Sequence, residues 1–315
     1  MLAIGIDIGG TSIKGAAITK EGKVYDVFSL EVKKEYDQNQ TITLLIEKVN
    51  AYIKEQGFKK EEILGIGIGV PGSIDSVNGV VSFSNNLRWK ELPIVEMMEK
   101  GTGLKVRITN DANAATLGEA KFGAGKEYKD IIMLTLGTGV GGGIVVNGKL
   151  VEGNQGKGAE LGHTTLVLDG LTCSCGRKGC LEMYASATAL IRETKAAMEK
   201  DKSSLMWEES EKLGKVDGRV AFNAERRGDK AAHEVVEYYI KCLSEGILNF
   251  ANIFRPEAVI LSGGIANEGE YLTTRLTEYC RKQNFGYIGT PEVKILISKL
   301  GYDSGKIGAA ALLFD

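Results

Sequence analysis

The chain has 315 residues, 43% of them hydrophobic and 25% charged, which is the composition of an ordinary soluble globular protein. Because a single core rarely grows beyond about 250–300 residues, this length allows two compact lobes. The formal net charge of −2 provides no basic excess for nucleic acid or an anionic membrane, and no apolar run approaches the roughly 20 residues that span a bilayer, so neither partner is expected.

The first part of the chain predicts a mixed α/β lobe that opens with an antiparallel meander. Three strands are expected at 2–8, 12–18 and 24–32, joined by turns at 9–11 and 21–22. Apolar residues at helical spacing predict a helix over 41–56, and a short buried strand follows at 63–70. A further strand at 106–109 leads into a helix that begins at Asn110.

A similar order recurs in the second part, where a strand at 131–136, a glycine turn and a returning strand at 143–146 end in the hairpin dipeptide Asn147-Gly148. The repetition indicates an internal duplication, with a cleft between two lobes. The remaining predicted elements are helices at 186–200 and 230–254, a strand from 259 into a glycine turn, and a last helix at 307–314. Residues 201–218 are polar and form either a solvated helix or a loop.

A compact group of metal-type ligands is the most specific feature of the chain. Three of the five cysteines and one of the two histidines fall within 163–180: His163, Cys173, Cys175 and Cys180. A closed Cys₃His set is typical of structural zinc, and its flanking carboxylates are Glu160 and Glu182. The alternative is a set of buried thiols beside an unrelated histidine.

The cysteines also indicate the compartment. Cys242 and Cys280 stand in helical patterns as core residues, and the first residues lack the charged start and long apolar core of a signal peptide. Thiols that serve a metal and a core, without an export segment, predict a reducing cytoplasm.

Two glycine turns that follow strands are suited to phosphate, because glycine lets backbone N–H groups approach oxyanions and a threonine hydroxyl adds a donor. They consist of Gly9, Gly10 and Thr11, and of Gly137, Thr138 and Gly139. For either alone, a tight hairpin without a ligand is the alternative. The second turn matches the dinucleotide G-x-G-x-x-G pattern by letter, but a strand and hairpin follow it instead of a helix, which excludes a Rossmann motif.

Several polar residues adjoin these turns. Asp7 ends the first strand, where a carboxylate can hold Mg²⁺ directly or through water, and Lys14 is either a phosphate contact or a solvated side chain. Asp111 follows a strand and begins a helix, so it is either a helix cap or a general base for an attacking hydroxyl; with phosphate turns nearby, we favour the base. Asn85, in a polar loop, is either a polyol ligand or a turn residue.

These motifs, in this order and over essentially the whole chain, resemble the ROK family of repressors, open reading frames and sugar kinases. The matching motifs are Asp7-Ile-Gly-Gly-Thr11, Gly69-Val-Pro-Gly72, Asn85-Asn-Leu87, Asn110-Asp-Ala-Asn113, Leu136-Gly-Thr-Gly-Val-Gly141, Glu160-Leu-Gly-His163 and Cys173-x-Cys175-Gly-x-x-Gly-Cys180-x-Glu182. The last two together are highly specific for the family.

The resemblance implies an α/β, two-lobed actin/hexokinase-like (ribonuclease H-like) fold with an interlobe cleft and a zinc-binding loop. The smaller lobe would span 1–118, completed by a C-terminal helix at 303–315, and the larger lobe would span 119–302 and carry the zinc site. The implied partners are a hexose and ATP, in a homodimer or homotetramer.

The resemblance also implies roles for individual residues. Asp111 would be the catalytic base, and the implied sugar ligands are Asn85, Asn110, Asp111, Glu160, His163 and Glu182. The two glycine turns would line the nucleotide phosphates, with Gly263 and Gly264 near the adenosine and its phosphates. His163 would be shared, with one ring nitrogen on structural Zn²⁺ and the other facing a sugar hydroxyl, while Mg²⁺ would accompany ATP.

The resemblance allows three functions. The favoured one is an ATP-dependent hexose kinase that phosphorylates the 6-hydroxyl of glucose. The runner-up is a ROK kinase for another sugar (N-acetylmannosamine, allose, fructose or mannose), since one or two pocket contacts separate such substrates. The third is a sugar-sensing repressor, which is disfavoured because it needs a helix-turn-helix before the first strand, where only Met1 to Ala3 stand.

Overall fold

The computed structural model describes residues 1–33, 35–285 and 291–314, and the chain divides into two compact units. The first unit consists of 1–129, 143–159 and 299–315, and the second of 130–142 and 160–298. The division expected from the sequence, at 118/119 and 302/303, stays a prediction. In the described part of the chain, no helix combines the length and the apolar character needed to cross a membrane.

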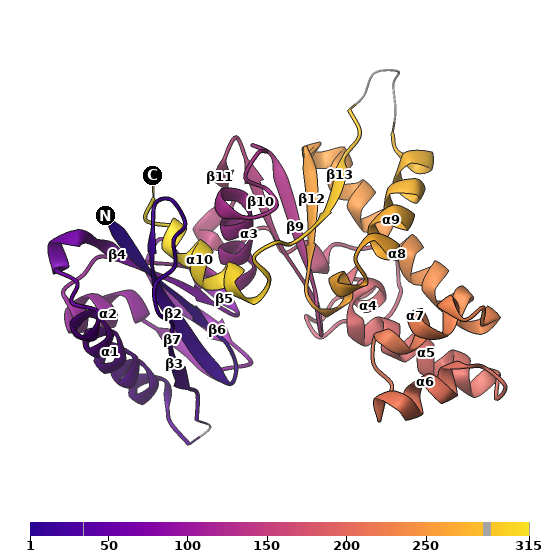
Figure 1. Cartoon of the computed structure of the whole chain (residues 1–315), viewed down its shortest axis with the longest axis horizontal. Helices are drawn as coiled ribbons and strands as arrows, with labels where there is room; N and C mark the ends of the chain where they lie inside the picture. Colours follow the sequence, from indigo (N-terminus) through magenta and orange to yellow (C-terminus); the bar gives the residue numbers. More distant parts are fainter. Residues whose placement is uncertain (34, 286–290, 315) are drawn as a thin grey trace. The chain divides into compact units, whose positions relative to one another are not determined.

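The first unit is built on a five-stranded sheet in the order β3-β2-β1-β4-β8, with β1, β4 and β8 parallel and the hairpin β1-β2-β3 antiparallel (Figure 1). Its strands are β1 (Leu2–Ile8), β2 (Ser12–Thr19), β3 (Phe28–Glu31), β4 (Ile63–Val70) and β8 (Val106–Asn110). The strands predicted at 2–8 and 63–70 are confirmed. The strand predicted at 24–32 is wrong in its first part, where Val24 makes only an isolated bridge to Ile18.

Helices α1 (Gln38–Glu55) and α2 (Ile94–Thr102) and a small antiparallel sheet complete this half of the unit. The sheet contains β5 (Ser73–Asp75), β6 (Val80–Ser84) and β7 (Trp89–Leu92). Helix α1 begins three residues before the predicted start, because Asp37 and Gln40 form a capping box. Ile4, Ile66 and Leu45 are fully buried in the common core of these elements.

Two further helices pack against each other and against the strands at the middle of the five-stranded sheet. Helix α3 (Asp111–Phe122) follows β8 directly, and α10 (Ser304–Ala311) contacts α3, β1 and β4. The last helix was predicted at 307–314, but it begins and ends one turn earlier, after the 3₁₀ helix η5 (Gly301–Asp303). Of the C-terminal segment predicted at 303–315, Asp315 lies outside the described residues.

The second sheet has the order β11-β10-β9-β12-β13, in which β9, β12 and β13 are parallel. Its strands are β9 (Ile131–Leu136), β10 (Val140–Val146), β11 (Lys149–Leu150), β12 (Ala258–Ser262) and β13 (Lys294–Ile297). The boundary between the units falls inside β10, so β11 belongs to the first unit. The predicted strand at 131–136 is confirmed.

Helices form most of the second unit. They are α4 (Glu182–Ala185), α5 (Ala187–Lys200), α6 (Met206–Leu213), α7 (Arg219–Arg226), α8 (Lys230–Phe254) and α9 (Glu270–Gln283). The helix predicted at 230–254 is confirmed, and within 201–218 the helical alternative holds, since α6 buries Met206. Short 3₁₀ helices complete the chain: η1 (Lys60–Glu62), η2 (Asn154–Gly156), η3 (Leu161–His163) and η4 (Gly264–Glu268). The mixed α/β class is therefore confirmed.

Candidate active site

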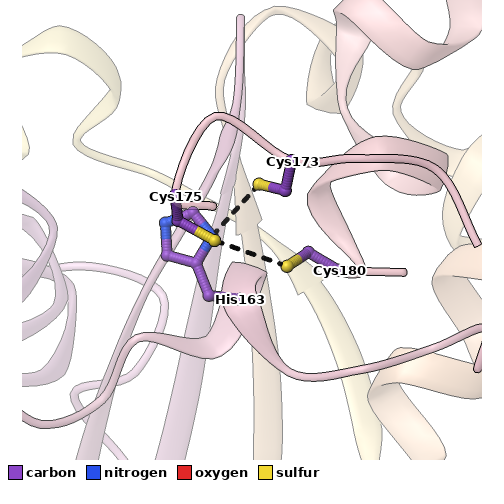
Figure 2. Close-up of side chains that lie close together, drawn as sticks. All are labelled: His163, Cys173, Cys175 and Cys180. Atoms are coloured by element: carbon purple, nitrogen blue, oxygen red, sulfur yellow. Dashed lines mark hydrogen bonds between the residues drawn. The ribbon is translucent and has the colours of Figure 1, made fainter. Parts of the chain in front are cut away.

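The four metal-type ligands lie together in the second unit. The ligand atoms of His163, Cys173, Cys175 and Cys180 all lie within 4.8 Å of one another (Figure 2). His163 Nδ1 is 3.6 Å from the Cys173 sulfur, and the sulfurs of Cys175 and Cys180 are 3.6 Å apart. Cys173 and Cys180 are buried, whereas Cys175 is exposed.

These distances fit a tetrahedral zinc ion. Zn–S and Zn–N bonds of about 2.3 and 2.0 Å place two thiolates about 3.8 Å apart, and a thiolate about 3.5 Å from an imidazole nitrogen. The observed separations of 3.6 Å therefore match the edges of such a tetrahedron. Burial, with the neighbouring thiols of Cys175 and Cys173, raises the pKa of the Cys180 thiol to about 12. The donor set and its spacing fit structural zinc.

Turns rather than helices or strands position the cysteines. The Cys173 N–H donates to the Arg177 carbonyl at 2.8 Å, and the Gly176 N–H donates to the Cys173 carbonyl at 3.0 Å. Gly176 and Gly179 adopt φ angles of 88° and 75°, which favour glycine. The Arg177 N–H also lowers the pKa of the Cys175 thiol. The loop thus turns tightly enough to bring three sulfurs to one point.

Glu182 connects this loop to the second glycine turn. It is the first residue of α4, immediately after the cysteine loop, and its two carboxylate oxygens face different partners. Oε1 lies 3.7 Å from the Cys173 sulfur, while Oε2 accepts from the Val140 N–H at 3.0 Å. One side chain therefore contacts both the metal cluster and the strand that leaves the glycine turn.

The glycine turns of the second unit lie at neighbouring strand ends. Gly137 to Gly139 follow β9, and Gly263 and Gly264 follow β12, its parallel neighbour in the sheet. The Gly137 carbonyl accepts from the Ala187 N–H at 2.9 Å, and the Thr138 carbonyl accepts from the Thr188 hydroxyl at 2.7 Å, so the first turn is fixed to α5. Thr138 is exposed, as are both Gly263 and Gly264. This edge offers backbone groups to a ligand.

In the first unit, two carboxylates lie close together at strand ends. Asp7 lies near the end of β1, and Asp111 is the first residue of α3. Burial and the negative charge of Asp111 raise the pKa of Asp7 to about 6, against the smaller opposing effects of Lys306 and Lys14. Burial also raises the pKa of Asp111, opposed by the Ala112 N–H. A raised pKa strengthens a carboxylate as a general base relative to an ordinary aspartate.

The neighbouring candidates occupy the same unit. Asn110 caps α3, accepting from the Ala112 N–H at 2.9 Å, and donates to the Gly72 carbonyl at 3.1 Å. Lys14 is exposed and lies opposite Asp7 in the pairing of β1 with β2. The turn of Gly9, Gly10 and Thr11 joins these two strands, and Asn85 is exposed in the turn between β6 and β7.

The predicted sugar ligands fall on both units. Asn85, Asn110 and Asp111 belong to the first unit, and Glu160, His163 and Glu182 belong to the second. Within each unit, Asp111 is close to Asp7, and Glu182 is close to the cysteine cluster. The roles assigned to these residues stay predictions.

Two contacts beside Asp7 and Asp111 were not expected from the sequence. The buried Thr109 donates to Glu152 Oε1 at 2.6 Å, directly before Asn110. Gly305, in the first turn of α10, packs against the Asp7 carboxylate: a Cβ built there would lie 2.8 Å from its carboxyl carbon. These partners are far apart in the chain, so no local sequence signal marks them.

The fold is that of the hexokinase-like α/β proteins. The crystal structure of a ROK family glucokinase from Streptomyces griseus, in complex with glucose and AMPPNP, matches with a TM-score of 0.79 and 33% identity, covering 99% of each chain. The chain belongs to the ROK family, whose model matches residues 3–315, so the resemblance drawn from the motifs is confirmed.

Two relatives represent different activities within the family. The glucokinase of Thermotoga maritima is 38% identical over 312 residues, which cover 98% of this chain and 96% of that protein. The xylose repressor of Caldicellulosiruptor bescii is 31% identical over 314 residues, which cover 99% of this chain and 78% of that protein. Both kinases and regulators therefore share this sequence pattern.

Proposed function

We propose that this ROK family chain is an ATP-dependent sugar kinase that transfers the γ-phosphoryl group to the 6-hydroxyl of glucose. The observation that carries the proposal is the pair of partly buried carboxylates at strand ends, Asp7 and Asp111, with raised pKa values. The relatives support the substrate, because the T. maritima protein is a glucokinase and the S. griseus structure is a complex with glucose and AMPPNP.

In this mechanism Asp111 is the general base. Its carboxylate orients the 6-hydroxyl and takes the proton as the oxygen attacks the γ-phosphorus. Asn110 holds the start of α3 through its bonds to Ala112 and Gly72, so the carboxylate keeps one direction. Asn110 and Asn85 donate hydrogen bonds to other sugar hydroxyls. The raised pKa of Asp111 strengthens it as a base relative to an ordinary aspartate.

Backbone N–H groups receive the nucleotide phosphates. The Gly9 N–H donates to the Ser12 carbonyl at 2.9 Å and the Gly137 N–H to the Gly139 carbonyl at 3.1 Å, so these two bonds hold the turns in shape. The N–H groups of Gly10 and Thr11 in the turn after β1, and of Thr138 and Gly139 in the turn after β9, donate to phosphoryl oxygens on which negative charge develops. Lys14 adds a positive charge beside the first turn, and Gly263 and Gly264 contact the adenosine and its phosphates. Asp7 would hold the Mg²⁺ that accompanies ATP, and that ion neutralises phosphate charge when bound.

The zinc-type cluster forms the wall that recognises the sugar. His163 faces the cluster with Nδ1, which leaves Nε2 to meet a sugar hydroxyl. Glu160, two residues before the buried Gly162, and Glu182 supply carboxylate acceptors for further hydroxyls. Zn²⁺, held by His163, Cys173, Cys175 and Cys180, would fix the orientation of the imidazole ring and is structural rather than catalytic.

A coupled assay with ATP and a panel of sugars tests the proposal. We expect the largest kcat/KM with glucose among glucose, mannose, fructose, allose, N-acetylglucosamine and N-acetylmannosamine, and formation of the 6-phosphate ester by NMR. A preference for N-acetylmannosamine or another hexose would support a sugar kinase with a substrate other than glucose. If the folded, zinc-loaded protein phosphorylated none of these sugars, the proposal that it is an enzyme would be wrong.

The sugar-sensing repressor has sequence support from the C. bescii relative. The same assay distinguishes a repressor from a kinase, because a repressor binds sugar without consuming ATP. A homodimer or homotetramer is also proposed, from the family resemblance, and light scattering coupled to gel filtration distinguishes the two states.

A further inference from the structure

The carboxylate of Glu119 is fully buried in the first unit, on the last part of α3. Its Oε2 accepts from the N–H groups of Ala124 at 2.7 Å and Lys299 at 3.1 Å, and its Oε1 accepts from the Leu300 N–H at 2.7 Å. A buried carboxylate without partners is costly, and hydrogen bonds to an ionised acceptor are strong. Glu119 therefore fixes the backbone of two segments that are remote in sequence.

One of these segments is the point where the chain returns to the first unit. Ser298 is the last residue of the second unit, and its N–H donates to the Leu261 carbonyl, at the end of β12, at 2.9 Å. The next residue, Lys299, belongs to the first unit and donates to Glu119. Since bonding changes from one unit to the other between consecutive residues, Glu119 determines where the chain enters α10.

The amino-terminal turn of α10 contacts Asp7. The backbone at Gly305 approaches so closely that a Cβ there would lie 2.8 Å from the carboxyl carbon of Asp7 and 2.9 Å from one of its oxygens. The next residue, Lys306, is 2% exposed and hydrogen-bonds Asp303, one turn earlier. The direction of the Asp7 carboxylate thus depends on where α10 begins, and a Cβ at residue 305 would force that carboxylate to shift.

We propose that Glu119 is a positioning residue for phosphoryl transfer: it anchors the entry to α10 and, through Gly305, sets the direction of the Asp7 carboxylate. This inference rests on the proposed function, in which Asp7 holds the Mg²⁺ of ATP. Glu119 touches no reacting atom. It stands about two helical turns after Asp111 on α3, so one helix carries the base at its start and this anchor near its end.

The test is Glu119→Gln, which keeps the shape of the side chain and replaces one acceptor oxygen with an NH₂ donor. Either orientation of the amide directs a donor at one of the backbone N–H groups that Glu119 now accepts from. We expect about a tenfold higher Mg²⁺ concentration for half-maximal activity, with a lower kcat, because partners behind a metal ligand contribute about 10–100-fold to affinity or activity. Glucose affinity measured by calorimetry without nucleotide should stay within about twofold, since Ala124, Lys299 and Leu300, which donate to Glu119, are not among the proposed sugar ligands.

Two further variants accompany it. Gly305→Ala displaces the Asp7 carboxylate directly and should reproduce the altered Mg²⁺ requirement while Glu119 is intact. Glu127→Gln removes an exposed carboxylate soon after α3 and serves as the matched control, with an unchanged Mg²⁺ dependence. If Glu119→Gln does not fold, Glu119→Asp can replace it, because it keeps the negative charge on a shorter side chain. Its Mg²⁺ requirement should rise in the same direction but by less.

Hydrogen exchange provides a readout that does not depend on activity. Backbone amides at 299–306 should exchange faster in Glu119→Gln than in the unmodified chain or Glu127→Gln, even if no sugar is phosphorylated. Failure of the unmodified chain to turn over any sugar, with faster exchange in the variant, would overturn the proposed function and leave the anchor in place. An unchanged Mg²⁺ requirement in an active, folded Glu119→Gln, or unchanged exchange at 299–306, would overturn the positioning role.

Discussion

The cysteine cluster and the Asp7–Asp111 pair are constructed in opposite ways. The cluster lies in an irregular loop, where Cys175 is exposed and the four side chains meet through sulfur contacts of 3.6 Å. Asp7 and Asp111 instead lie on β1 and α3, each of which packs into a buried hydrophobic cluster. Turns and their hydrogen bonds place the cysteines of the loop, whereas the core holds the carboxylates in place.

This difference separates two sources of order. In a small metal site, the binding free energy of the ion adds to the folding free energy of the loop that carries its ligands. Around Asp7 and Asp111, burial of the surrounding apolar side chains supplies the folding free energy. The same burial disfavours the charged form of both carboxylates, so their pKa values are raised. Changes at the first site should therefore affect local structure and sugar recognition, and changes at the second should affect chemistry and pH dependence.

The largest effect is expected at Asp111, the proposed general base. Asp111→Asn should lower kcat by about 10²–10⁴-fold, the usual contribution of a positioned general base, and a coupled assay with ATP and glucose measures it. The cap of α3 by Asn110 remains, so the variant should fold and bind glucose by calorimetry. In the unmodified chain the acid limb of the kcat profile should lie above the ordinary aspartate range, because burial raises the pKa of Asp111. Near-normal turnover of the variant would remove Asp111 from the mechanism.

A smaller effect is expected at the metal loop. Cys175→Ala should lose zinc, measured by elemental analysis, and raise the KM for glucose by about 10–100-fold while the KM for ATP changes little. Cys175 is exposed, so its loss leaves the core of the second unit intact. Cys280→Ala is the matched control, since that cysteine lies on α9 outside the cluster and should keep zinc and KM. Zinc loss with normal sugar binding would break the link between metal and pocket.

The smallest effect is a pH-dependent change in stability at Asp7. Its pKa rises from 3.8 to about 6 on folding, so protonation stabilises the fold fully below pH 3.8, and this contribution is lost as pH rises through 6. Without Mg²⁺, Asp7→Asn should therefore unfold with a free energy about 1–3 kcal/mol higher than the unmodified chain at pH 8, and the difference should disappear near pH 4. Denaturant titration measures both. A difference that does not vary with pH would contradict the buried-charge explanation.

Local patterns account for the elements that could be predicted. The strands β1, β4 and β9 and the helix α8 have the predicted bounds, because buried runs and helical spacing between glycine or proline signals are visible within a few residues. The short strands β5, β6 and β7 and the helix α9 were not anticipated. Strands of three to five residues are too short to show a clear alternation of apolar and polar residues, so they cannot be predicted from the sequence pattern. The sheet that they form depends on pairing across turns.

The chain alone determined its family, the order of its main elements and the type of each ligand. Thiolate and imidazole spacing, strand-ending carboxylates and glycine turns are properties of short segments. Only the tertiary structure brought Glu152 to Thr109, Gly305 to Asp7 and Glu119 to Lys299 and Leu300. Those pairs are remote in sequence, and their meeting depends on how α3 and α10 pack on the sheet, since burial and close approach arise only when the whole core forms.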